Sequence, residues 1–275
     1  MTERIATPRH YLMCKPTYFE VAYEINPWMD MHRETDNARA VAQWQVLHDT
    51  FVEWGHTVEL IDPIPGLPDM VYAANGATII DGICYSASFR YPQRQPEGPA
   101  YAGWFAERGF LVHEAAEVNE GEGDILMVGD VILAGTGFRT DKSAHGELAA
   151  VTGREVVSLE LVNPSFYHLD TALAVLDSDP AHPLIAYYPP AFSPTSQAVL
   201  AERYPDAVIA SDRDAAALGL NAVSDGRRVV VAPGAVDLAA RLTELGFEPR
   251  GVDTSELLKG GGGAKCCTLE IRRAG

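Results

Sequence analysis

The sequence has little positive charge, few cysteines and no long apolar runs. Its 275 residues include 21 Lys and Arg against 38 Asp and Glu, a formal net charge of −17. This charge argues against nucleic acid and anionic membranes as partners, and it is compatible with attraction of a small cationic substrate. No apolar stretch is long enough to span a bilayer, and the first residues lack the basic-then-apolar pattern of a signal peptide.

Four cysteines, two of them adjacent, make a poor disulfide framework. We therefore expect a reducing, cytoplasmic setting, with Cys14 and Cys84 in the core because apolar residues flank both. The hydrophobic content of 47% and charged content of 21% are those of a globular protein. We expect residues 1–275 to form a single catalytic domain.

A unit of helix, glycine and strand recurs along the chain. Apolar residues step by three and four between residues 40 and 54, as on one face of a helix, and Gly55 ends that helix before a strand at 56–61. Similar helix ends fall near residues 109, 153, 204 and 246. The period is roughly 40 to 55 residues, which is typical of a repeat architecture.

Pairs of short strands lie between these helices. The pairs are 77–80 with 83–85, 124–128 with 131–134, and 223–224 with 229–231. Five strand–strand–helix–strand units cannot bury their apolar faces singly, so we expect an α/β fold, a five-bladed α/β propeller with helices outside. The alternative is a doubly wound parallel sheet, which the tight strand pairs disfavour. In a propeller, loops from all blades meet at one axial end.

The last thirty residues hold the most distinctive stretch. Four glycines at 260–263 lead to Cys266 and Cys267, and the alternation that follows predicts a short strand. A phosphate-binding loop would need Gly-Lys-Ser/Thr opening a helix, which is not the pattern here. A flexible linker with buried, inert cysteines is one interpretation, and an exposed nucleophilic cysteine is the other.

Polar clusters at 67–76, 120–124 and 166–170 fall in different predicted blades. His168 is the best partner for a nucleophilic Cys266, because imidazole titrates near neutrality, although a lone histidine in an apolar run is also typical of a core. Glu122 or Asp124 would orient that histidine or accept a hydrogen bond from a cationic substrate. We expect Glu120 on a solvated acidic turn. No cofactor is expected, and no metal, because adjacent cysteines rarely bind one zinc ion.

Four motifs in this order resemble the guanidine-modifying superfamily: Leu-Pro-Asp-x-Val-Tyr, Gly-x-Gly-Asp, Phe-x-His-Leu-Asp and Gly-Gly-x-x-Cys-Cys-Thr. That superfamily includes dimethylarginine dimethylaminohydrolases, arginine deiminases, arginine dihydrolases and amidinotransferases. The resemblance covers nearly the whole chain and implies the pentein fold, a five-bladed α/β propeller. It also implies a small cationic guanidino substrate and chemistry at a guanidino carbon.

The resemblance assigns roles to individual residues. Cys266 would attack the guanidino carbon to form a covalent thiouronium, and His168 would protonate the leaving amine and then activate water. Carboxylates would surround the guanidinium, since a planar cation binds well between such groups. The implied substrate-binding residues are Asp170 and the Glu122/Asp124 pair at the guanidinium, Asp69 at the amino-acid end, and Arg90 and Arg139 at the α-carboxylate.

Two asparagines, Asn26 and Asn75, indicate which branch of the superfamily the chain resembles most. Deiminases and dimethylaminohydrolases usually have a carboxylate where this chain has Asn75, and Asn75 together with Asn26 is similar to the arginine dihydrolase branch. That branch produces ornithine, carbon dioxide and ammonia. The alternatives are a dimethylarginine dimethylaminohydrolase or deiminase that stops at citrulline, an amidinotransferase, and a non-catalytic arginine-binding protein. Association into a homo-oligomer is left open.

The two adjacent cysteines give a direct test. Cys266→Ser should abolish turnover of a guanidino substrate, because a serine hydroxyl is a far weaker nucleophile than a thiolate. Cys267→Ser should leave most of the turnover. Product formation by each purified variant checks this. An inactive Cys267→Ser variant together with an active Cys266→Ser variant would show that Cys267, and not Cys266, is the nucleophile.

Overall fold

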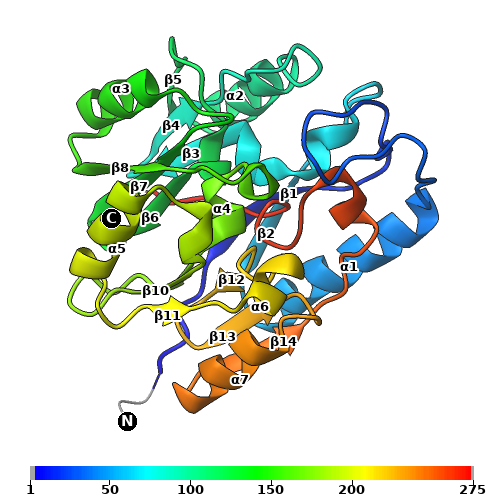
Figure 1. Cartoon of the computed structure of the whole chain (residues 1–275). Coiled ribbons are helices and arrows are strands. Elements are labelled where there is room, and N and C mark those ends of the chain that lie inside the picture. Colours follow the sequence, from blue (N-terminus) through cyan, green and yellow to red (C-terminus); the bar gives the residue numbers. More distant parts are fainter. Residues whose placement is uncertain (1–3, 274–275) are drawn as a thin grey trace.

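The structure is a computed structural model that describes residues 4–273, and its strands form five three-stranded sheets. In every sheet two strands pair antiparallel and a third is added parallel to the middle strand. The connection to the third strand runs through a helix, as parallel pairing requires. Figure 1 shows these helices around the outside of the molecule and the strands inside. The five-bladed α/β propeller is confirmed.

Four blades are continuous in sequence. The first consists of β3 (Ala77–Ile80), β4 (Ile83–Ser86), α2 (Glu97–Glu107) and β5 (Leu111–His113), and the second of β6 (Ile125–Val128), β7 (Val131–Thr136), α3 (Lys142–Thr152) and β8 (Val156–Glu160). The third consists of β9 (Leu173–Asp177), β10 (Leu184–Tyr187), α5 (Pro194–Arg203) and β11 (Val208–Ile209). The fourth consists of β12 (Val223–Ser224), β13 (Arg228–Val231), α7 (Val236–Glu244) and β14 (Glu248–Gly251).

The fifth blade joins the two ends of the chain. Its elements are β15 (Leu269–Glu270), β1 (His10–Cys14), α1 (Asn37–Glu53) and β2 (Thr57–Ile61). β15 pairs antiparallel with β1, with Leu12 opposite Leu269. This pairing closes the ring, so the glycine-rich segment just before β15 is held beside the N-terminal strand (Figure 1).

The helices end where the sequence predicts. Asp36 accepts a hydrogen bond from the backbone N–H of Arg39 and caps α1, and Gly55 follows that helix at a φ of +83°. The buried face of α1 includes Trp44 and Phe51, each of which stabilises the fold by about 1.5–3 kcal/mol on burial. Cys14 and Cys84 are also buried, as expected.

The strand pair β9–β10 was not predicted. The two strands are separated by residues 178–183, which contain two prolines, and the pairing shifts register between Leu184 and Ile185. An irregular turn of this kind lacks the short glycine signal that marks the other hairpins. The glycine-rich loop, by contrast, does lead into the expected short strand, β15.

Short helical turns precede the first strand of each blade, two before β3 and one before each of the others. These turns are η1 (Pro68–Val71) and η2 (Ala73–Gly76) before β3, η3 (Gly121–Gly123) before β6, α4 (Leu169–Ala172) before β9, α6 (Asp212–Ala216) before β12, and η6 (Leu257–Gly260) before β15. Among the first strands, β15 contacts β3, β6 contacts β9 and β9 contacts β12, and η2 contacts η3 as η3 contacts α4. The turns therefore gather at one axial end. In the described residues, no helix has the length and apolarity needed to cross a membrane.

Candidate active site

Cys266 lies in the turn between η6 and β15, with 2% of its surface exposed. Its Sγ donates to Oδ2 of Asp170 at 3.2 Å and accepts from Nδ2 of Asn221 at 3.1 Å. Burial, followed by the negative charge of Asp170, raises the pKa of the Cys266 thiol. The sulfur is therefore a neutral thiol in the free protein at pH 7.

Asp170 is positioned by α4, which brings it beside Cys266 from a different blade. It is fully buried, and its Oδ1 has no hydrogen-bond partner among residues 4–273. Burial raises the pKa of Asp170 to about 7, against the opposing charge of Lys265. A buried carboxylate oxygen without a donor is suited to accept an N–H from a bound cation.

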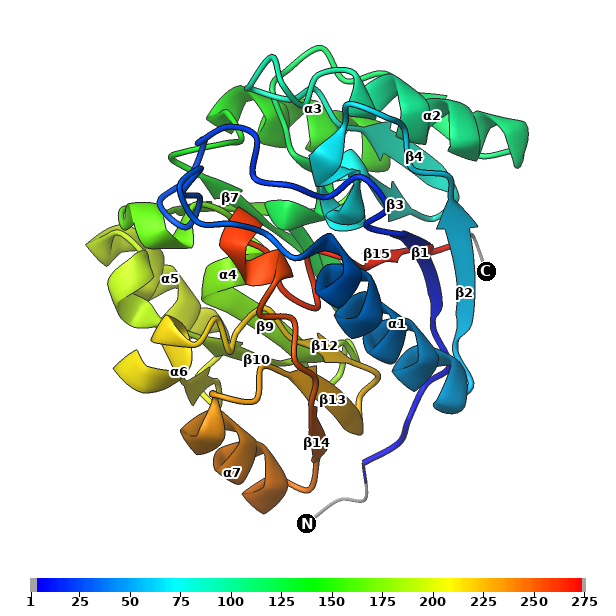
Figure 2. The same ribbon diagram turned by 90° about the vertical axis from the view of Figure 1, so that its right-hand side faces the viewer.

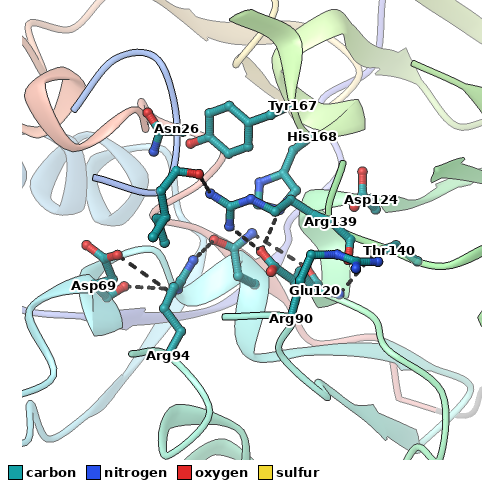
Figure 3. Close-up of polar contacts among 12 residues, drawn as sticks. Asn26, Asp69, Arg90, Arg94, Glu120, Asp124, Arg139, Thr140, Tyr167 and His168 are labelled. Atoms are coloured by element: carbon teal, nitrogen blue, oxygen red, sulfur yellow. Dashed lines mark hydrogen bonds and ion pairs between the residues drawn. The ribbon is translucent and has the colours of Figure 1, made fainter. Parts of the chain in front are cut away.

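His168 caps the N-terminus of α4, and its Nε2 is 2.8 Å from Oε2 of Glu120 (Figure 3). The same oxygen accepts from Nη1 of Arg139 at 2.8 Å. Burial opposes ionisation of Glu120, but the charges of Arg139 and His168 outweigh it and hold the pKa of Glu120 well below its usual range. In the described structure Nδ1 of His168 is buried without a hydrogen-bond partner.

The expectation that Glu120 lies on a solvated turn is wrong. Glu120 is fully buried and is the carboxylate that contacts His168. Glu122 instead accepts from Lys265 at 2.7 Å and from Arg272, so its carboxylate stands in a separate ion-pair cluster. Asp124 accepts from the backbone N–H of Leu169 at 2.9 Å, and burial raises its pKa to about 6.

A second polar group surrounds Arg94, which the sequence did not single out. Its Nη1 donates to Oδ1 of Asn75 at 2.8 Å, and its Nε and Nη2 bind both oxygens of Glu97. Asp69 lies beside it, 3.8 Å from Nε of Arg94. The residues 94 and 97 resemble an ordinary surface ion pair in the sequence, and only the fold reveals that both are buried.

Arg90 and Arg139 have different surroundings. Arg139 is 2% exposed and lies over the rings of Tyr91 and Tyr167. Arg90 is at the rim, where it binds the carbonyl of Arg139 at 3.2 Å and the carboxylate of Asp141. Of the two predicted arginines, the fold thus buries one within the cluster and leaves the other partly exposed.

The segment after β1 forms one side of the site. Nδ2 of Asn26 donates to the carbonyl of Gly260 at 3.1 Å, and the carbonyl of Ile25 accepts from Arg139 at 2.9 Å. The hydroxyl of Tyr23 donates to Oδ2 of Asp69 at 2.9 Å. Figure 2 shows this blue segment beside the orange-red turn η6. Asn26 therefore ties the N-terminal segment to the glycine-rich loop.

The arrangement brings together a thiol, an imidazole and several buried carboxylates. Burial also raises the pKa of Asp69, whose Oδ1 lacks a hydrogen-bond partner among residues 4–273. Two unpartnered carboxylate oxygens, on Asp69 and Asp170, can take the N–H groups of a molecule that is cationic at both ends. Among the same residues, no group of three His, Cys, Asp or Glu side chains is placed to hold a metal ion.

A propeller of this kind with Cys266 and His168 at its axial end defines the class of guanidine-modifying enzymes. The chain belongs to that superfamily and is a hydrolase acting on guanidino C–N bonds. This assignment rests on the similarity of the chain to individual members of the superfamily. No protein-family model matches the sequence.

The similarity extends to two kinds of member. A dimethylarginine dimethylaminohydrolase of Mycobacterium tuberculosis is 56% identical, over 98% of this chain and 87% of that protein. A bifunctional arginine dihydrolase/ornithine cyclodeaminase of Synechocystis is 38% identical over 94% of this chain, which spans only 37% of that protein. The solved N-terminal domain of the cyanobacterial arginine dihydrolase, bound to substrate, superposes with a TM-score of 0.91 at 36% identity, covering 96% and 98% of the two chains.

The different environments of Glu120 and Glu122 predict different effects of substitution, on turnover for the first and on stability for the second. Glu120→Gln should lower kcat about 10²- to 10⁴-fold, because the amide cannot balance the charge of a protonated His168. Glu122→Gln should lower the free energy of unfolding by about 3 kcal/mol, since Lys265 and Arg272 lose their buried counter-charge. Steady-state kinetics and urea denaturation of both variants measure these effects. A large kcat loss confined to Glu122→Gln would contradict the assignment.

Proposed function

We propose that this hydrolase is an arginine dihydrolase. It would convert arginine and two molecules of water into ornithine, carbon dioxide and two molecules of ammonia. The supporting observation is the neutral Asn75, whose Oδ1 is occupied by Arg94 while its Nδ2 lies 3.5 Å from the carbonyl of Glu120. The amide therefore offers its second N–H as a donor, and not negative charge, next to His168.

Asn75 and His168 both face Gly123. A Cβ atom at position 123 would lie 2.3 Å from Nδ2 of Asn75 and 3.2 Å from Nδ1 of His168. The missing side chain lets the amide approach the imidazole. After a first hydrolysis the substrate carries a neutral ureido group with a carbonyl oxygen. An amide N–H can donate to that oxygen, whereas a carboxylate would repel it, so Asn75 favours retention of the ureido group for a second attack.

The first half-reaction begins with binding of the guanidinium against Asp170. Its positive charge favours ionisation of Cys266. The thiol releases its proton to water, and the resulting thiolate attacks the guanidino carbon. A C–S bond forms. His168 gives a proton to one amino group, the C–N bond breaks, and ammonia leaves a covalent thiouronium on the sulfur.

In the second half-reaction water replaces the sulfur. His168, now neutral, accepts a proton from water, and the hydroxide adds to the thiouronium carbon. Collapse breaks the C–S bond, the proton of the added hydroxyl passes to water, and the ureido product and the thiolate result. In the dihydrolase reaction the thiolate then attacks the ureido carbon, and His168 protonates the nitrogen of ornithine so that this C–N bond breaks and ornithine leaves. Water next breaks the C–S bond and releases carbamate, which breaks down to carbon dioxide and ammonia.

Contacts at the other end of the substrate follow from charge. We expect Asp69, whose Oδ1 has no hydrogen-bond partner among residues 4–273, to accept the α-ammonium group. Arg90 and Arg139 remain the arginines that we expect to hold the α-carboxylate. Arg94 lies between Asp69 and Asn75 and is a third candidate donor to the α-carboxylate of the substrate.

A second candidate is dimethylarginine dimethylaminohydrolase activity. The relative from Mycobacterium tuberculosis that bears this name is 56% identical to the chain, more than the arginine dihydrolases at 38% and 36%. Such an enzyme would stop after one hydrolysis and release dimethylamine and citrulline. An amidinotransferase would need an amine acceptor for turnover.

Product analysis separates these candidates. With arginine we expect ornithine and two ammonia per arginine consumed, because Asn75 keeps the ureido intermediate bound for the second hydrolysis. Mass spectrometry of the amino-acid products and an ammonia assay measure both. Citrulline with one ammonia from arginine, or citrulline with dimethylamine from asymmetric dimethylarginine, would contradict the dihydrolase proposal and favour the second candidate. The Cys266→Ser protein is the control for uncatalysed breakdown.

The raised pKa of Asp170 predicts the pH dependence of arginine turnover. Only the ionised carboxylate binds a guanidinium, and burial raises the pKa of Asp170 to about 7. The active form is therefore lost as the pH falls, and kcat/KM should drop about tenfold per pH unit below pH 7. Initial rates at low arginine concentration between pH 5.5 and 8.5 measure this limb. A constant kcat/KM between pH 6 and 8 would disprove it.

A further inference from the structure

Asn221 lies between α6 and β12, so it connects the blade of β12, β13 and β14 with Cys266. It is 2% exposed, and both ends of its amide contact the surroundings of Cys266. Oδ1 accepts from the backbone N–H groups of Gly263 and Cys266, each at 3.1 Å. Nδ2 donates to the carbonyl of Asp170 and to Sγ of Cys266, also at 3.1 Å each.

We propose that Asn221 is a positioning residue that fixes the sulfur of Cys266 and favours its thiolate form. This rests on the proposed function, in which Cys266 is the nucleophile. Four hydrogen bonds through one planar amide set the distance between the glycine-rich loop, the sulfur and α4. The loop accommodates this contact through Gly263, where a Cβ atom would lie 2.9 Å from Oδ1 of Asn221.

The amide has a role that Asp170 cannot fill. Asp170 accepts the thiol proton in the free protein, but an arriving guanidinium competes for the same carboxylate. The N–H of Asn221 instead donates to the sulfur in both states, and it binds the charged thiolate more strongly than the thiol. A hydrogen bond to the charged form lowers the pKa of a thiol. Asn221 thus keeps the sulfur in place when Asp170 turns to the substrate.

Aspartate is the informative replacement. Asn221→Asp keeps an oxygen for the N–H groups of Gly263 and Cys266, but it removes the donor to sulfur and adds a negative charge next to Asp170. A charge-assisted hydrogen bond of this kind corresponds to about one to two pKa units. The thiolate fraction of Cys266 at a fixed pH should therefore fall at least tenfold.

Alkylation by iodoacetamide measures that fraction without turnover, because the thiolate displaces iodide and the thiol does not. We expect the rate of Cys266 carboxamidomethylation, followed by peptide mass spectrometry at pH 8, to fall at least tenfold in Asn221→Asp. We also expect kcat for the guanidino substrate to fall at least 100-fold with KM changed less than threefold. Asn37→Asp is the matched control, since the side chain of Asn37 donates to the carbonyls of Pro16 and Phe19, and the alkylation rate of Cys266 in this variant should be normal.

An unchanged alkylation rate in a folded Asn221→Asp protein would overturn the proposal, whether or not the wild-type protein hydrolyses arginine. Normal alkylation in the wild type without any turnover would instead count against the proposed function alone. A measurement on the wild-type protein covers the case in which Asn221→Asp does not fold. The side-chain amide ¹⁵N–¹H resonances of Asn221 should shift when Cys266 is alkylated, and unshifted resonances would equally overturn the proposal.

Discussion

The antiparallel pairing of β15 with β1 is the constraint on which the rest of the structure depends. Each blade alone has a small sheet with one helix and exposes apolar edges, so stability comes from closing the ring. Closure through the chain ends also places the segment before β15 at the axial end where the other turns gather. Cys266 is in that segment, and Leu269, three residues later, is a fully buried residue of the closing pair. The geometry of the nucleophile is thus tied to the closure of the fold.

The buried acids of the site differ in whether they have a cation of their own. Glu120 pairs with Arg139, Glu97 with Arg94, and Glu122 with Lys265 and Arg272. Asp170 and Asp124 form no ion pair among the described residues, and burial raises their pKa to about 7 and about 6. Burial raises the pKa of Glu97 to about 7 as well, in spite of its contact with Arg94. In the proposed reaction a guanidinium supplies positive charge to Asp170. Its binding there would offset the free-energy cost of burying that carboxylate.

Much of the fold and the positions of two central residues could be predicted from the sequence, because both depend on local patterns. The helix periods and tight turns repeat, and Cys266 and His168 stand in polar motifs between apolar segments. The acidic partner of His168 could not be predicted. Within Glu-Gly-Glu-Gly-Asp every acid is a candidate, and only the turn η3, with Gly121 at a φ of +54°, decides which carboxylate faces the imidazole.

Arg94 and Asn221 escaped prediction for a related reason. Arg94 and Glu97 form an i,i+3 ion pair of a kind that is common on helix surfaces, and its burial arises from the packing of α2 against η2. Asn221 stands alone in an apolar segment and is linked to Cys266 only through the closure of the ring. Contacts between residues far apart in sequence leave no local pattern, so a single sequence cannot reveal them.

The choice between one and two hydrolyses depends on the charge next to the reacting carbon more than on overall identity. The 56% identity to a dimethylarginine dimethylaminohydrolase sums over the whole chain, most of which builds the propeller. The number of ammonia molecules released depends on whether the neutral ureido intermediate leaves faster than the sulfur attacks it again. At position 75 the chain has an amide whose Oδ1 accepts from Arg94 and whose Nδ2 donates one N–H to the carbonyl of Glu120, so its second N–H is left for an oxygen of the substrate. A carboxylate would favour the cationic guanidinium and release the neutral ureido group, whereas an amide discriminates less between the two, and this smaller difference favours the dihydrolase reaction.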